Sequence, residues 1–353
     1  MNIKVNASSE YEILMEEGIL ERAGEEISKV LGSPARLCVV CDKNLYRLYG
    51  RETLSFHQSL AEAGFNVCTY VFPGGENYKN INTVQGILDF LSENSFTRSD
   101  GVVALGGGIT GDVAGFAASI YMRGIACIQV PTSLLAMADS SVGGKTGVNT
   151  AAGKNMTGSF WQSKLVLMDP NVLETLPEKC LLDGLAEIIK AAFIKDVSII
   201  DSLADGLTEA TAKAILVKKG IVEADEREAD QRKLLNLGHT IGHAIEKCSD
   251  YHVTHGRAVM TGMYLTALAA DDRGWSSEPM APYIKQIIDA FGYKVITDFA
   301  SAELAEAALN DKKRSGDSIT IVYPDQPGHC EMKTLPADEL EAFIAQGLEK
   351  ARV

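Results

Sequence analysis

Short, unbroken apolar runs recur along the first half of the chain. They are rich in Val, Ile and Leu and occupy residues 37–41, 67–72, 101–105, 126–130 and 165–168. Because polar residues do not alternate within them, these runs predict strands buried on both faces, as in a parallel sheet covered by helices. Helical patterns lie between the runs, notably at 44–63 and 80–94. This alternation of strand and helix favours a doubly wound α/β domain.

The second half of the chain has mainly helical patterns. They predict helices at residues 181–194, 208–229, 234–248, 256–272, 279–291, 301–310 and 337–350, with one short strand at 319–323. The boundary is best placed near Pro177, which gives an α/β domain over 1–177 and a mainly α-helical domain over 178–353. Since no flexible linker separates the two domains, we expect a site in the cleft between them.

Length and composition are those of an ordinary globular protein. The 353 residues are enough for two domains, and 46% are apolar and 23% charged. The net charge of −14 argues against a nucleic-acid partner, which would require a basic face. No segment approaches the roughly 20 apolar residues that span a membrane, and the N-terminus lacks a signal-peptide pattern. We therefore expect a cytoplasmic protein without a membrane partner.

The seven cysteines are scattered and odd in number, which is not typical of a secreted disulfide framework. Cys38 and Cys41 form a C-x-x-C pair inside a predicted strand. Residues three apart on a strand point to opposite faces. The pair is therefore interpreted as two buried thiols rather than a redox or zinc motif.

Two glycine-rich tracts indicate phosphate binding. In the first, a buried strand leads into Gly106, Gly107 and Gly108 and then into a helix, so backbone N–H groups and the helix dipole could face a phosphate. The second tract contains Gly143-Gly144-Lys145-Thr146, which is similar to the end of a P-loop. A P-loop would need glycine at position 139, where this chain has Asp139, so a nucleoside-triphosphatase is disfavoured.

Basic and acidic side chains near these tracts are candidate ligand contacts. Arg123, Lys145 and Lys154 could bind phosphate or carboxylate, although each alone could be a solvated surface residue. Gly74 to Lys79 and Asp42 follow predicted strands, at the edge where α/β sheets bind ligands. Glu76 could bind ribose hydroxyls there, and a solvated turn is an equal alternative.

Four of the six histidines fall between positions 239 and 255. His239 and His243 are four apart and would share one helix face. Thr240 stands where H-E-x-x-H has glutamate, so a metalloprotease is disfavoured. With His255, and with a carboxylate from elsewhere, these histidines could form a metal site with open positions.

Glu187 is the best candidate for that carboxylate. It lies three residues before Lys190 in an otherwise apolar helix pattern, where a charged pair must be satisfied. A buried salt bridge without a metal explains this segment equally well.

Further charged residues precede and follow the histidines. Lys218, Asp225 and Arg232 are spaced by seven and predict one stripe of a helix, which Asn236 would extend toward His239. The basic cluster at 311–314 could be a surface loop or a second anion anchor.

The motifs together resemble the 3-dehydroquinate synthases. They are Gly-Gly-Gly-x-x-Gly-Asp, Asp-Ser-Ser-Val-Gly-Gly-Lys-Thr, Gly-Lys-Asn, Gly-Leu-Ala-Glu-x-Ile-Lys, Leu-Leu-Asn-x-Gly-His-Thr-x-Gly-His-Ala and Asp-Lys-Lys, in this order. The resemblance spans roughly residues 40–330. It implies a Rossmann-like NAD-binding domain, a helical domain with one divalent metal (zinc, or alternatively cobalt), and a homodimer.

The resemblance also implies a role for each matching residue. The metal ligands would be Glu187, His239 and His255. Catalytic side chains would be Lys145, Lys190, Asn236 and His243. Substrate contacts would come from Arg123, Lys154, Asn155, Lys218, Arg232, Lys312 and Lys313, with Arg123 reaching a neighbouring subunit. NAD would contact Asp42, Gly74, Gly75, Glu76, Asn77, Tyr78, Lys79, Gly107, Gly108, Ile109, Thr110, Gly111, Asp112, Thr132, Ser133, Asp139, Lys145, Lys154, Val172, Leu173, Glu174 and Thr175.

The implied reaction converts 3-deoxy-D-arabino-heptulosonate 7-phosphate to 3-dehydroquinate and phosphate, in the shikimate pathway, with NAD regenerated in each turnover. Alternatives are another sugar-phosphate cyclase such as 2-deoxy-scyllo-inosose synthase, a metal-dependent polyol dehydrogenase, or an inactive binding protein. One departure is Arg257, where the family often has glutamate after His255-Gly256. It changes the charge beside the implied metal site.

Overall fold

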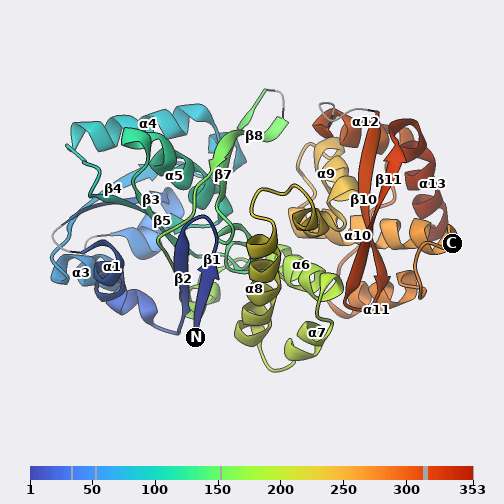
Figure 1. The fold of residues 1–353 in the computed structure, drawn as a ribbon, viewed down its shortest axis with the longest axis horizontal. Helices are drawn as coiled ribbons and strands as arrows, with labels where there is room; N and C mark the ends of the chain where they lie inside the picture. The colour runs from blue at the N-terminus through green and yellow to red at the C-terminus, as the bar shows by residue number, and fades with distance from the viewer. Residues whose placement is uncertain (33–34, 52–53, 152, 313–316, 353) are drawn as a thin grey trace. The chain divides into compact units, whose positions relative to one another are not determined.

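The computed structural model describes residues 1–32, 35–51, 54–151, 153–312 and 317–352 (Figure 1). The chain consists of two compact units, Met1–Leu181 and Leu182–Val353. The division falls within the first turn of helix α6 (Glu178–Ile194), which begins directly after Pro177.

The first unit is built on a seven-stranded sheet. All five predicted strands are present and lie next to one another, and every pair except β1–β2 is parallel, which confirms the α/β prediction. The strand order is β1 (Asn2–Asn6), β2 (Glu10–Met15), β9 (Leu165–Met168), β6 (Ala126–Pro131), β5 (Gly101–Gly106), β3 (Arg36–Asp42) and β4 (Asn66–Phe72).

Helices cover both faces of this sheet, which explains its continuous apolar runs. Helices α4 (Ile81–Glu93) and α5 (Gly108–Ile120) bury one face, whereas α1 (Ala23–Leu31) and α3 (Ser55–Glu62) lie on the other (Figure 1). The strand register pairs Asp42 with Phe72 and Gly106 with Pro131. The carboxyl ends of these strands therefore end at one edge, where the loops with candidate ligand residues begin.

Several elements of the first unit differ from the prediction. The β1–β2 hairpin was not predicted, although its burial alternates residue by residue in β1. The predicted helix at 44–63 is interrupted: a short helix α2 (Lys43–Leu45) and a π-helical turn (Tyr46–Gly50) form its first part, and α3 forms its second. The segment around Lys145 and Lys154, for which no strand was predicted, forms the hairpin β7 (Lys145–Thr150) and β8 (Gly153–Phe160).

The second unit is mainly helical, as predicted. Its core joins four helices near the C-terminal end of the chain to a two-stranded hairpin, of which only the first strand was expected. Among the helices described here, none is both long and apolar enough to cross a bilayer. Besides α6, the elements are α7 (Ser198–Ser202), α8 (Leu207–Ala224), α9 (His239–Cys248), α10 (His255–Asp272), α11 (Ala281–Ala290), α12 (Ser301–Lys312), β10 (Ser318–Gln326), β11 (His329–Pro336) and α13 (Leu340–Ala351).

The predicted stripe of Lys218, Asp225 and Arg232 is wrong, because the helix does not continue through it. Helix α8 ends at Ala224, and the Asp225 carboxylate accepts the N–H groups of Ala229, Asp230 and Arg232. These backbone hydrogen bonds fold the chain into a tight turn. Arg232 and Asn236 then lie in a 3₁₀ segment (Gln231–Asn236), separate from α9.

Glycines bring α9 and α10 into close contact. These helices begin at His239 and His255, two of the predicted metal ligands. A Cβ atom at Gly262 would lie 2.0 Å from the carbonyl oxygen of Gly238 and 2.9 Å from the nitrogen of Gly242. Gly238 itself has a φ of 74°, a left-handed conformation that favours glycine, at the N-cap of α9. The spacing of the two helices therefore depends on residues without side chains.

We predict that Gly262→Ala lowers the free energy of unfolding by about 1–3 kcal/mol or more, because the added methyl group forces the α9 and α10 backbones apart. Urea denaturation of the two proteins would measure the change. Gly220→Ala is the matched control: this helical glycine of α8 has open space around its Cα, so alanine there should stabilise by about 0.4–1 kcal/mol. Equal stability of the two variants would contradict the prediction.

Candidate functional site

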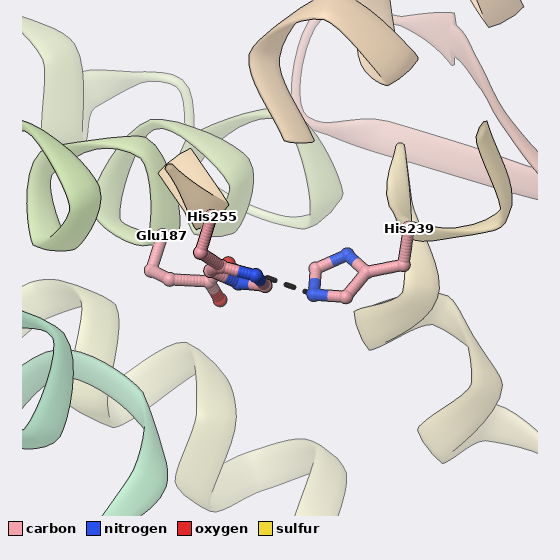
Figure 2. A group of neighbouring side chains, drawn as sticks. All are labelled: Glu187, His239 and His255. Atoms are coloured by element: carbon pink, nitrogen blue, oxygen red, sulfur yellow. Dashed lines mark ion pairs between the residues drawn. The ribbon is translucent and has the colours of Figure 1, made fainter. Parts of the chain in front are cut away.

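Three side chains from three helices of the second unit converge on one point. Glu187 comes from the buried half of α6, His239 is the first residue of α9, and His255 is the first residue of α10. Figure 2 shows the carboxylate and the two imidazoles pointing toward one another. One donor atom from each residue lies within 4.8 Å of the others. The structure thus brings together the three residues predicted as metal ligands.

The distances suit a metal ion better than direct hydrogen bonds. Glu187 Oε1 lies 3.6 Å from His239 Nε2 and 3.4 Å from His255 Nε2. Tetrahedral coordination with bonds of about 2.0–2.1 Å places ligand atoms about 3.3 Å apart. Glu187 Oε1 is also buried and makes no hydrogen bond to the residues that the structure describes. Such an oxygen requires a partner, and the donor set of one carboxylate and two imidazoles fits a divalent transition metal.

The second nitrogen of each imidazole is also held. His239 Nδ1 lies 3.0 Å from the main-chain carbonyl of Leu237, and His255 Nδ1 lies 3.3 Å from Glu246 Oε2. Hydrogen bonds of this kind, to a carbonyl or a carboxylate, are typical of histidines that ligate metals through Nε2. They fix both the ring orientation and the tautomer that leaves Nε2 free to bind.

The charges around these residues affect their protonation. Burial raises the pKa of the Glu187 carboxyl, but the positive charges of Lys190 and His255 outweigh burial and hold the pKa well below its usual range. Burial and the nearby Lys190 hold the pKa of His239 well below its ordinary value, so this imidazole is neutral, as a metal ligand must be.

His255 experiences the opposite effect. Burial opposes its charged form, but hydrogen bonds and charges from Glu187 and Glu246 raise the pKa to about 10. Two carboxylates around one imidazole therefore stabilise positive charge at this point. A divalent cation on Nε2 would supply that charge in place of a proton.

His243 lies at the edge of this cluster rather than within the triad. Its ring centroid is 5.1 Å from that of His239, which confirms that the two share a helix face. His243 is exposed, and it forms a second possible metal group with Glu246 and His255. Arg257, the departure from the family pattern, donates from Nε to the main-chain oxygen of Lys294, 3.0 Å away.

Several predicted substrate contacts in the second unit are buried basic groups. Lys190 pairs with Glu187 Oε2 and is only 3% exposed, Lys218 is 6% exposed, and Arg232 is 1% exposed. Buried basic side chains are rare unless an anion balances them. Asn236 donates to Glu228 Oε1 at 2.8 Å. Lys312 ends α12, where no side chain is described, and Lys313 lies outside the described residues.

The first unit connects three separate predicted cofactor segments by one polar network. Lys79 is buried and lies 2.5 Å from both Asp112 Oδ2 and Asn155 Oδ1. Asn149 donates to Glu76 Oε1 at 2.7 Å, and its own Oδ1 accepts the N–H of Asn155. The loop 74–79, the start of α5 and the β7–β8 hairpin are therefore one polar unit.

The glycines after β5 let neighbouring side chains pack closely against their backbone. Helix α5 begins at Gly108, and a Cβ there would lie 2.9 Å from Ser140 Oγ. A Cβ at Gly111 would lie 2.7 Å from Gln129 Oε1. Thr132 N donates to the Gly106 carbonyl at 3.0 Å, which joins the β6 loop to this turn. The predicted residues Gly107, Ile109, Thr110 and Ser133 belong to the same region.

The other predicted contacts of the first unit lie in several turns. Asp42 caps α2 with its carboxylate and packs against Gly74, where a Cβ would come within 2.7 Å. Gly75, Asn77 and Tyr78 continue that turn, and Asp139 lies in a π-helical turn (Ala136–Ser140).

The predicted contacts at 172–175 and Arg123 lie in short 3₁₀ segments. Val172, Leu173, Glu174 and Thr175 lie in Pro170–Thr175, where Val172 is buried and Thr175 Oγ1 lies 2.8 Å from the Tyr49 hydroxyl. Exposed Arg123 has a φ of 69° and follows Met122, which has a φ of 47°. A positive φ is unfavourable for residues other than glycine. Two such residues in succession are a strained feature that often marks a functional turn.

Sequence reasoning did not assign a role to Glu246, Asn149 or Asp183. Asp183, one turn before Glu187, accepts the N–H of Gly256 at 2.8 Å and so holds the first turn of α10. Glu246 could have been found, because it lies three residues after His243 on the same apolar helix pattern. Asn149 contacts the Glu76 side chain and Asp183 contacts the Gly256 backbone, both distant in sequence, and no local pattern indicates such contacts.

Comparisons with solved structures place the fold among sugar-phosphate cyclases. A 2-epi-5-epi-valiolone synthase from Streptomyces hygroscopicus subsp. jinggangensis 5008, solved with NAD⁺ and Zn²⁺ bound, aligns with a TM-score of 0.85 at 26% identity, over 99% of this chain and 100% of that one. A 2-deoxy-scyllo-inosose synthase complexed with carbaglucose-6-phosphate, NAD⁺ and Co²⁺ shares the fold with a TM-score of 0.86 at 23% identity, over 98% and 100%.

Sequence comparison is more specific. The family models for the 3-dehydroquinate synthase N-terminal and C-terminal domains match residues 69–183 and 184–314. A 3-dehydroquinate synthase of Streptococcus sanguinis (strain SK36) is 41% identical over 357 residues, which cover 98% of this chain and 99% of that protein. The chain belongs to the 3-dehydroquinate synthase family, and the prediction from the motifs is confirmed.

We predict that His239→Ala lowers the divalent metal that the protein retains to a trace of the wild-type content, because the triad would lose one of its three candidate ligands. Metal analysis after gel filtration would measure the loss. His252→Ala is the matched control, since this exposed histidine lies in the same segment but outside both clusters. Full metal content in the His239 variant would remove His239 from the ligand set.

Proposed function

We propose that the chain is a 3-dehydroquinate synthase, which converts 3-deoxy-D-arabino-heptulosonate 7-phosphate to 3-dehydroquinate and phosphate. Its relatives of that name match nearly the full length at about 40% identity. The observation that carries the proposal is the divided role of Glu187. One oxygen pairs with buried Lys190, and the other faces two imidazole nitrogens. This arrangement suits a divalent metal ion on which substrate oxygens can bind.

Glu187, His239 and His255 would hold one divalent ion, for which zinc is proposed and cobalt is the alternative. When bound, the ion polarises hydroxyl and carbonyl oxygens of the substrate as a Lewis acid. Lys190 pairs with Glu187 Oε2 and favours the ionised carboxylate, which could then bind a metal ion through Oε1 at neutral pH. Exposed His243, on the same face of α9 as His239, is proposed to exchange protons with the substrate.

The buried basic side chains are proposed to hold the anionic ends of the substrate. Arg232 presents a planar guanidinium that suits a carboxylate or phosphate, and Lys218 and Lys190 add point charges. Because these groups are already out of water, an incoming anion is bound with little further desolvation of the protein. Lys145, Lys154 and Asn155 of the β7–β8 hairpin are proposed to contribute further contacts, as are Lys312 and Lys313.

The nucleotide is proposed to bind at the carboxyl edge of the sheet in the first unit. When bound, NAD supplies the transient oxidation of a substrate hydroxyl and the later reduction that restores it. The turn before α5 would give its backbone N–H groups to the pyrophosphate, and Glu76 would accept the hydroxyls of a ribose. Asn149 holds Glu76 in place, whereas Lys79 bridges Asp112 and Asn155.

We further propose that the chain forms a homodimer through the exposed β7–β8 hairpin. Strand β8 pairs with β7 alone among the described strands, and residues 155–158 are exposed along its length. On this strand, the apolar side chains of Met156 and Phe160 are 39% and 42% exposed. At and after the end of α5, Ile120 and Met122 are 43% and 45% exposed. An exposed strand edge with apolar side chains is suited to pairing with a second copy. Light scattering would give the mass in solution.

The proposed reaction predicts phosphate release without net formation of NADH. Incubated with the heptulosonate phosphate, catalytic NAD and Zn²⁺, the enzyme should release one phosphate per substrate while absorbance at the NADH band stays flat after the first turnovers. A chelator should abolish release, and added Zn²⁺ should restore it. Stoichiometric NADH would indicate a polyol dehydrogenase, and turnover of glucose 6-phosphate instead would indicate a different sugar-phosphate cyclase.

We predict that Asn149→Ala weakens NAD binding by roughly tenfold, since the loss of hydrogen bonds to charged Glu76 and to the hairpin costs about 1.5–3 kcal/mol, part of which relaxation recovers. Isothermal titration with NAD would measure the affinity. The control is Asn66→Ala. Asn66 lies at the amino end of β4, opposite to the carboxyl end where NAD is proposed to bind, so this variant should bind NAD normally. An unchanged dissociation constant for the Asn149 variant would show that the polar network does not shape the cofactor site.

A further inference from the structure

Glu246 is a buried carboxylate whose contact with the triad the reaction scheme leaves unexplained. It lies on α9, one turn after His243, and is only 6% exposed. Its Oε2 atom lies 3.3 Å from Nδ1 of His255, across from the nitrogen that faces Glu187. A buried carboxylate is costly unless its charge is used. The geometry shows one use of this charge, because the carboxylate lies where it can hold the His255 ring.

A neutral imidazole has one N–H donor and one acceptor nitrogen. If Glu246 accepts the Nδ1–H of His255, the lone pair must be on Nε2, which lies 3.4 Å from Glu187 Oε1. His239 achieves the same tautomer differently, because its Nδ1 lies 3.0 Å from the neutral main-chain oxygen of Leu237. A carboxylate makes the ring that it holds a stronger metal ligand than a carbonyl does. The two histidines of the triad are therefore supported unequally.

We propose that Glu246 is the positioning residue of the metal site: it selects the Nε2-binding tautomer of His255 and strengthens that histidine as a ligand. The inference rests on the proposed metal site of Glu187, His239 and His255. It assigns Glu246 no contact with the substrate. Its role is expressed in metal affinity, with effects on turnover following from occupancy.

The geometry disfavours the alternative that Glu246 is itself a ligand, together with His243 and His255. In that arrangement His255 would bind through Nδ1, and its Nε2 would carry the proton toward Glu187. A neutral ring cannot offer both nitrogens as acceptors, so the two groups exclude each other. Glu187 Oε1 faces two imidazole nitrogens and makes no hydrogen bond to the described residues, so the first group is the one left incomplete without an ion.

The test compares three full-length variants by competition with a chromophoric chelator for Zn²⁺, and by the visible spectrum of the Co²⁺-loaded protein. Glu246→Ala removes the acceptor, and we expect the dissociation constant to rise about 10- to 100-fold. Glu246→Gln keeps an acceptor oxygen without the charge, so its affinity should fall between those of the wild type and the alanine variant. The Co²⁺ bands should shift in both.

Asp271→Asn is the matched control. Asp271 lies on α10, the helix of His255, and its carboxylate accepts the N–H groups of Met280 and Ala281 at the start of α11. This variant should lose stability but bind Zn²⁺ and Co²⁺ as the wild type does. Stability alone therefore cannot reproduce the expected result for the Glu246 variants.

Three results would overturn the inference. A folded Glu246→Ala protein with unchanged metal affinity would show that the carboxylate does not support His255. Two ions per wild-type chain, with one lost in the variant, would make Glu246 a ligand. A wild-type chain that binds no divalent ion would remove the proposed metal site itself. The first result differs from this one, because there the wild type binds the ion and only the role of Glu246 fails.

Discussion

The second unit depends on how the buried Glu187 carboxylate is satisfied. Its desolvation would be prohibitive if it were alone, and the chain offsets that cost from two sides. Lys190 neutralises one oxygen, and two imidazole nitrogens face the other at distances that fit an ion between them. Because the three helices that supply these groups must all approach this point, their packing is constrained by the chemistry. Gly256 against Asp183 and Gly262 against Gly238 permit that approach.

The first unit solves a different problem, which is to present backbone groups at one sheet edge. Parallel strands in register end together, and glycines let the following loops pack against one another. Polar side chains then connect loops that are far apart in sequence, through Lys79 and Asn149. Both units thus use glycine for proximity and buried charge for position. The family assignment is consistent with this arrangement, since the motifs that identify the family are the same glycines, lysines and histidines.

Much of the fold follows from local patterns in the sequence. Short runs of Val, Ile and Leu are typical of strands covered on both faces, and all five runs form neighbouring strands of one sheet, with β4 at its edge. The helices of the second unit were predicted because each buries an apolar face. The prediction failed where the apolar pattern is weak. Asp225 accepts three N–H groups after the end of α8, so the helix does not continue. The lysine-rich tract forms the β7–β8 hairpin, which was not predicted. Neither a side-chain cap nor an exposed two-stranded hairpin requires a regular spacing of apolar residues, so the sequence gives little sign of them.

By itself, the sequence determined the chemical inventory: clustered histidines, an acidic residue beside a lysine on an apolar helix, and glycine turns after strands. It left open whether Glu187 and Lys190 formed only a salt bridge. Tertiary structure added two further neighbours to this pair, because only the packing of three helices brings Glu187 Oε1 to within 3.6 Å of both imidazoles. The same packing places Glu246 behind His255 and Asp183 beneath Gly256. Contacts between helices distant along the chain carry no local signal, since helical periodicity indicates a buried face but not the partner that covers it.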